Sequence, residues 1–205
     1  MGLLDYLWFY PRIMFAFFVF LGILLGCNGA GKSTFALEYL PAYAGSIEYV
    51  NPDLMASGLS PIDIRLSALK SGRLALERIA MLIEARATFG FETTLSGRGH
   101  LKLLADARNA GYCVHLYYLW MPEKLVLPSR IRHRVLSGGH DVPSEDVFRR
   151  YSRSVANLRD YAKLADQLYV FDATRNPQEM IFGRNGRTHA KDARRAAVMR
   201  KELGI

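Results

Sequence analysis

The stretch Gly26–Ser33, GCNGAGKS, fits the phosphate-binding loop pattern G-x-x-x-x-G-K-[ST] at every required position. An apolar run (17–25) precedes it and a helix-compatible run (34–40) follows it, which is the strand–loop–helix setting that this pattern needs. Glycines let backbone N–H groups turn toward phosphate oxygens, and the positive end of the helix dipole adds to the attraction. We therefore expect a nucleoside triphosphate site here. A plain glycine-rich turn would leave the flanking strand and helix unexplained.

The polar residues of this loop have separate expected roles. The ammonium of Lys32 should reach the β- and γ-phosphates, and the hydroxyl of Ser33 should bind Mg²⁺ together with phosphate oxygens and waters. The expected ATP-binding residues are Gly26, Asn28, Gly29, Ala30, Gly31, Lys32, Ser33 and Thr34.

Composition limits the class of protein. The chain has 205 residues, enough for one domain with a sizeable core. Its net charge of +8 favours anionic partners such as nucleotides, sugar phosphates, nucleic acid or a membrane surface. The two cysteines, Cys27 and Cys113, make neither a disulfide scaffold nor a zinc spacing, which favours a reducing, cytoplasmic setting.

The apolar start of the chain has two readings. The run 13–25 could be taken for a signal peptide or a membrane anchor, but it is short for a membrane span and leads directly into the phosphate loop. We expect its end to be a buried parallel strand, which should be continuously hydrophobic. Residues 1–16 are then an extension of unknown role, and membrane binding is not expected.

Strand and helix patterns alternate along the rest of the chain, which predicts an α/β fold with a parallel sheet flanked by helices. The expected strands are 18–25, 47–50, 88–93, 112–120 and 168–171. The expected helices are 32–40, 62–86 with a break near Ser71-Gly72, 100–109, 123–136 and 144–164, the last capped by Ser144. The domain prediction is a body over 17–183, with a basic tail over 184–205 that is helical near its end.

Polar residues follow two of the expected strands, where the active site of a parallel sheet should lie. Asp53 could accept a proton from a substrate hydroxyl that attacks the γ-phosphate, or it could cap the next helix. Glu92 could hold Mg²⁺ through water or bind a substrate hydroxyl. Thr94 and Arg98 could bind phosphate or sugar, or they could be a packed threonine and a solvated arginine.

A second group of candidates surrounds Gly138-Gly139. The arginines Arg130, Arg132 and Arg134 precede this pair, and Arg149 and Arg150 follow it. A helix–loop–helix of this kind, over about 129–150, could be a lid whose guanidinium groups close on the transferring phosphoryl group. The alternative is a solvated basic face. We expect His140 to order the loop rather than to act as a base.

Taken together, the P-loop, the NPD segment at Asn51-Pro52-Asp53, FETT at 91–94 and GGHDVP at 138–143 resemble the zeta-toxin family of P-loop kinases. The resemblance runs from about residue 18 to 172. It implies a three-layer P-loop kinase fold with ATP or GTP and Mg²⁺, a helical arginine-bearing lid, and transfer of phosphate to the sugar 3′-hydroxyl of UDP-N-acetylglucosamine. It also implies an antitoxin as a possible partner.

Carried over by motif, Lys32 and Ser33 look like the phosphate and Mg²⁺ residues, and Asp53 looks like the base that activates the sugar hydroxyl. Glu92 and Thr94, with Arg98 nearby, look like substrate-binding residues. Arg134 and Arg150 look like the lid arginines of the family, with Arg130 and Arg149 as possible substitutes. The chain departs from the family pattern at Cys27, where relatives often have proline, at Pro52, at Phe148 and at Asp172-Ala173-Thr174, where relatives often have Asp-Asn-Ser.

Three rival functions fit parts of the sequence. The same machinery could phosphorylate another small alcohol or a nucleotide. The basic tail could belong to an ATPase stimulated by nucleic acid, although no helicase-type motif or aromatic–basic alternation accompanies the P-loop. The chain could also be a non-catalytic, nucleotide-binding partner of an antitoxin.

Overall fold

An interior strand of the sheet, β1 (Val19–Leu25), runs directly into the glycine-rich loop. Every residue of β1 after Val19 is buried, as expected for a strand with neighbours on both sides and helices on both faces. The strand pairs in parallel with β3 (Phe89–Thr93) and β4 (Tyr112–Trp120). This computed structural model describes residues 19–39, 48–136, 142–174, 179–184, 188–189 and 192–205.

The sheet has seven strands in the order β2-β3-β1-β4-β5-β6-β7. The four remaining strands are β2 (Tyr49–Val50), β5 (Gln167–Asp172), β6 (Glu179–Arg184) and β7 (Thr188–His189). The first five strands in this order are parallel, as predicted. The sequence analysis missed β6, which pairs antiparallel with β5, and β7, which pairs antiparallel with β6. The direction of β6 follows from chain length, because residues 173–178 are too few for the crossover of about a dozen residues that a parallel partner needs.

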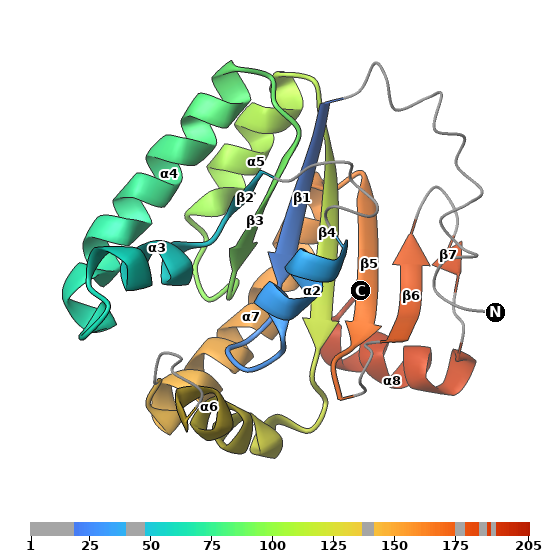
Figure 1. The fold of residues 1–205 in the computed structure, drawn as a ribbon. Helices are drawn as coiled ribbons and strands as arrows, with labels where there is room; N and C mark the ends of the chain where they lie inside the picture. The colour runs from blue at the N-terminus through green and yellow to red at the C-terminus, as the bar shows by residue number, and fades with distance from the viewer. Residues whose placement is uncertain (1–18, 40–47, 137–141, 175–178, 185–187, 190–191) are drawn as a thin grey trace.

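Helices cover both faces of the sheet (Figure 1). One buried cluster joins Leu21, Ile23 and Leu25 of β1 to side chains of four helices. These helices are α4 (Ala68–Glu84), α5 (His100–Asn109), α7 (Ser144–Leu164) and α8 (Ala193–Leu203). The second cluster joins Leu24 to Phe35 of α2 (Lys32–Tyr39). Because successive side chains of a strand point to opposite faces, the two clusters define three layers.

Two short helices lie close to the loop-bearing end of the sheet. Helix α3 (Pro52–Leu59) follows β2, and α6 (Leu127–Leu136) follows β4 through the 3₁₀ turn η4 (Lys124–Val126). The sequence analysis expected α6 but missed α3. A further 3₁₀ turn, η3 (Ile64–Ser67), leads into α4.

Two expectations about helices are wrong in detail. Helix α4 is continuous through Ser71-Gly72, and the Ser71 hydroxyl donates to the carbonyl of Ala68 within the same helix (3.0 Å). Ser144 is the first residue of α7 rather than its cap, since the cap position is held by Pro143 without a side-chain hydrogen bond. The expected helix near the end of the tail is confirmed as α8.

Some predictions fall on residues outside those described. The extension 1–16, the glycine pair Gly138-Gly139 and His140 are among these. Within the described ranges, no helix combines the length and the apolar character that a membrane crossing requires.

Candidate active site

The glycine-rich loop begins at Gly26, immediately after β1, and its shape depends on three glycines. Gly26, Gly29 and Gly31 have φ values of 145°, 82° and 86°, a backbone region that residues other than glycine rarely adopt. A Cβ on Gly26 would lie 2.9 Å from the carbonyl oxygen of Leu119, so that position has no room for a side chain either. The loop closes on itself through a hydrogen bond from the Ala30 N–H to the Cys27 carbonyl (3.2 Å).

Lys32 opens α2 and is buried against this loop. Its ammonium donates to the Cys27 carbonyl at 3.2 Å, which holds the charge along the loop at the positive end of the helix. Burial raises the pKa of the Cys27 thiol to about 11, so this cysteine is protonated near neutral pH and packs as a small apolar residue. Of the other predicted nucleotide-binding residues, Asn28 and Ala30 are buried, and Thr34 is exposed.

Ser33, the expected metal residue, faces the end of β3. Its hydroxyl donates to Glu92 Oε2 at 2.9 Å, and the Tyr49 hydroxyl donates to the same oxygen at 2.5 Å. Glu92 is buried, and burial together with this carboxylate raises the pKa of Tyr49, which therefore stays a donor. A hydroxyl and a carboxylate are hard oxygen ligands, so this pair fits Mg²⁺ better than a soft metal.

Asn51 fixes the direction of these hydrogen bonds. Its Oδ1 accepts the backbone N–H groups of Asp53 (2.9 Å) and Leu54 (3.1 Å), so its amide NH₂ is the group that meets Ser33 Oγ at 3.1 Å. The Ser33 oxygen is therefore an acceptor from Asn51 and a donor to Glu92, and one of its two lone pairs remains for a cation.

Asp53 lies in the first turn of α3 with an exposed side chain, and its backbone N–H is held by Asn51. Asn51 caps the helix, so the alternative role suggested for Asp53 in the sequence analysis, that of helix cap, is wrong. Asp53 thus comes two residues after Asn51, the residue that contacts Ser33, and its side chain is open to solvent.

The other two predicted substrate residues lie along the segment after β3. The Thr94 hydroxyl shares a hydrogen bond with Ser96 at 3.0 Å. Arg98 forms an ion pair with Asp160 of α7, and this hydrogen bond lowers the pKa of Asp160. The guanidinium of Arg98 is therefore engaged on α7.

The predicted lid arginines lie in different surroundings and do not all face the phosphate loop. Arg150 of α7 donates to Asn28 Oδ1 of the phosphate loop at 3.3 Å. Arg149 points elsewhere and pairs with Asp146 on the exposed side of its own helix (2.7 Å). Arg134 of α6 is partly buried, and Arg132 of the same helix is exposed.

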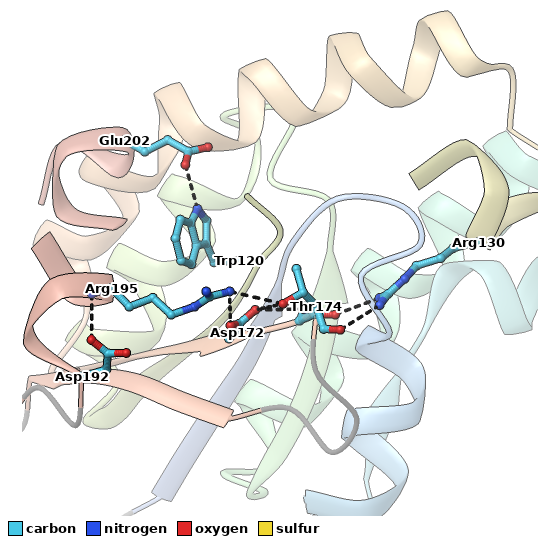
Figure 2. A network of polar contacts seen from close by, with 8 residues as sticks. Trp120, Arg130, Asp172, Thr174, Asp192, Arg195 and Glu202 are labelled. Atoms are coloured by element: carbon cyan, nitrogen blue, oxygen red, sulfur yellow. Dashed lines mark hydrogen bonds and ion pairs between the residues drawn. The ribbon is translucent and has the colours of Figure 1, made fainter. Parts of the chain in front are cut away.

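Arg130 reaches past the phosphate loop to the turn after β5. It donates to the carbonyls of Ala173 (2.8 Å) and Thr174 (3.4 Å), as Figure 2 shows for the labelled pair Arg130 and Thr174. Helix α6 itself lies against the loop, since a Cβ on Gly29 would meet Ile131 at 3.4 Å and the carbonyl of Leu127 at 3.5 Å.

The sequence analysis did not predict that Tyr49 and Asn51 belong to the site. A signal for Asn51 was present, because asparagine followed by proline and an acid is typical of a helix start, with the amide as cap and proline as first residue. Tyr49 carried no such signal, since an aromatic residue in a short strand is indistinguishable from a core residue.

Comparison with known proteins agrees with this architecture. No family model matches the chain. An uncharacterized protein of Haemophilus influenzae (strain ATCC 51907 / DSM 11121 / KW20 / Rd) is 33% identical over 126 residues, which is 62% of this chain and 88% of that protein.

Two solved structures are similar over almost the whole chain. One comes from the PezAT chromosomal toxin-antitoxin system of Streptococcus pneumoniae, with a TM-score of 0.66 and 16% identity over 96% of this chain and 89% of that one. The other is the AvrRxo1-ORF1:-ORF2 complex with ATP, with a TM-score of 0.70 and 18% identity over 91% of this chain. This chain spans 64% of the AvrRxo1 chain that it matches. The chain belongs to the same family as the Haemophilus influenzae protein, and its fold is that of the zeta-toxin-like P-loop kinases.

Proposed function

We propose that the protein transfers the γ-phosphate of ATP to a hydroxyl group of a nucleotide sugar, with UDP-N-acetylglucosamine as the first acceptor to test. The observation that carries the proposal is the chain of contacts from Ser33 to Glu92 and Asn51, since it links the phosphate loop to the helix that bears Asp53. The ATP bound in a structural neighbour supports this choice of donor.

In this proposal each side chain has one task. Asp53 accepts the proton of the acceptor hydroxyl as its oxygen attacks the γ-phosphorus, and ADP departs from the opposite side. Lys32 and Arg150 stabilise the charge that spreads over the phosphoryl oxygens. Ser33 and Glu92 would hold Mg²⁺, which neutralises charge on the β- and γ-phosphates when bound.

The test is transfer of labelled phosphate from ATP to a panel of nucleotide sugars, followed by product mass spectrometry. We expect Asp53→Asn to lower turnover by about 10²–10⁴-fold, the usual contribution of a general base. The matched control is Asp106→Asn, the same chemical change on the exposed side of α5, which should keep full turnover. Full turnover in Asp53→Asn would show that another group takes the proton.

Lys32→Ala should abolish transfer, because it removes the ammonium that the proposal places on the phosphates. The fold should persist, since the hydrogen bond that is lost is the one to the Cys27 carbonyl in the loop. Lys70→Ala, on the exposed face of α4, is the control. Products that carry phosphate on a different small alcohol would keep the mechanism and replace the acceptor.

We also propose an antitoxin-like protein partner. One structural neighbour comes from a toxin-antitoxin system and another from a complex of two proteins, AvrRxo1-ORF1 and -ORF2, which supports this proposal. Expression of the chain alone should slow growth of a bacterial host, and co-expression of the adjacent gene should relieve it. Unimpaired growth with a catalytically active protein would argue against a toxin role.

The nucleic-acid rival is less well supported by the geometry. Two arginines of the basic tail are occupied within the protein: Arg195 pairs with Asp172, and Arg200 lies over the ring of Phe182 at 4.9 Å. A salt-dependent gel shift with RNA-stimulated ATP turnover would favour that rival instead.

A further inference from the structure

The turn after β5 holds a buried carboxylate. Asp172 is fully buried at the end of the strand, and its Oδ1 accepts hydrogen bonds from the backbone N–H (2.9 Å) and the hydroxyl (2.6 Å) of Thr174. Its second oxygen forms an ion pair with Arg195 of α8. Since a buried charge is strongly destabilising without a partner, this pair ties α8 to the carboxyl end of the sheet.

Arg195 does more than neutralise Asp172. Its guanidinium also donates to the Thr174 hydroxyl at 3.3 Å and lies 5.8 Å from the centre of the Trp120 ring. The Trp120 N–H in turn donates to Glu202, near the end of α8, at 3.1 Å. Helix α8 is therefore fixed to the sheet near both of its ends, as Figure 2 shows.

A second guanidinium holds the same turn from the other side. Figure 2 shows Arg130 reaching Thr174 from the direction opposite to Arg195. Arg130 belongs to α6, whose residues Leu127 and Ile131 pack on Gly29 of the phosphate loop. The turn thus lies between the C-terminal helix and the helix that meets the loop.

We infer that Arg195 is a positioning residue for α6. Arg195 holds the turn at residues 172–174, Arg130 transmits this position to α6, and α6 sets the place of Arg134 and the packing on the phosphate loop. The basic C-terminal helix is then part of the phosphate-binding apparatus through Arg195, without touching phosphate. The functional meaning of this link rests on the proposed kinase activity, whereas the link itself is testable without any substrate.

The experiment is hydrogen–deuterium exchange of the full chain without nucleotide, read at the amides of α6. We expect Arg195→Ala to raise exchange in α6 by about tenfold, the effect of losing hydrogen bonds to a charged group, with exchange in α4 unchanged. Arg194→Ala removes the same charge from the exposed side of the same helix and is the matched control. Arg195→Lys keeps the pair with Asp172 and should recover part of the protection.

Arg195→Ala leaves Asp172 buried without its partner and could prevent folding. The variant Asp172→Asn/Arg195→Gln removes both charges together and answers the same question. Arg130→Ala should reproduce the exchange pattern, and combining it with Arg195→Ala should add little if both act through one turn.

Equal α6 exchange in the Arg195 variants and in Arg194→Ala would overturn the inference. Failure of the proposed function is a separate result: the wild-type chain would transfer phosphate to no acceptor while α6 still loosened in the Arg195 variants. If the inference about Arg195 and the proposed kinase function are both correct, the Arg195 variants should also raise the KM for ATP, and Arg194→Ala should not.

Discussion

At the scale of single residues, Asn51 joins two parts of the site with one amide group. Its oxygen starts α3 and so places Asp53, while its nitrogen orients the Ser33 hydroxyl toward Glu92. A residue with only an oxygen could do the first task but not the second. The base candidate and the cation candidate are therefore coupled by a side chain that need not touch substrate.

Substitution can separate these two tasks. Serine is also a good helix cap, but it is too short to reach Ser33, so Asn51→Ser should keep the stability of α3 and lower turnover by about tenfold. Asn51→Ala should show the same loss of turnover and a further loss of about 1 kcal/mol in the free energy of unfolding. Urea unfolding and the transfer assay check both, and normal turnover in Asn51→Ser would disprove the orienting role.

At the scale of elements, α4 continues through the Ser71-Gly72 pair, where the sequence predicted a break. Ser71 is buried and bonded within the helix, and a Cβ on Gly72 would meet no atom within 4 Å. The glycine therefore lowers helix stability without any packing benefit. We expect Gly72→Ala to raise the free energy of unfolding by about 0.5–1 kcal/mol in urea titration.

The contrasting substitution is Gly29→Ala. The positive φ of Gly29 and the nearness of Ile131 predict a loss of stability and of nucleotide binding. A stabilising effect at Gly29, or a destabilising one at Gly72, would contradict this account of the two elements.

At the scale of the whole molecule, the partial burial of His115 makes stability depend on pH. Desolvation lowers the pKa of this β4 histidine to about 3, and its ring lies 4.2 Å from the ring of Phe20. The unfolded chain binds a proton at this site near pH 6.5 and the folded chain does not. The contribution of neutral His115 to the free energy of unfolding is therefore fully present above pH 6.5 and is lost as the pH falls toward 3.

A neutral replacement isolates this contribution. Relative to His115→Gln, the wild type should lose about 3 kcal/mol of unfolding free energy between pH 6.5 and pH 4. Urea titrations of both proteins at several pH values measure the difference. Parallel pH profiles would mean that the folded protein can protonate His115 easily.

Much of the molecule was predictable because it rests on local patterns. The glycine spacing of Gly26–Ser33 between an apolar strand and a helix specifies the phosphate loop, and continuous apolar runs specify buried parallel strands. Helix α5 and strand β4 were predicted with their observed bounds, since periodicity and turn residues mark both of their ends.

The rest depended on contacts between residues far apart in the chain. Nothing local indicates that Arg150 turns to Asn28 while Arg149 turns to Asp146, or that Arg130 reaches the turn after β5. Nor could the basic residues near the C-terminus be assigned to a buried ion pair with Asp172. The periodicity of the sequence predicts which face of a helix or strand a side chain occupies. Its partner depends on how those faces pack, and this packing is decided only when the chain folds.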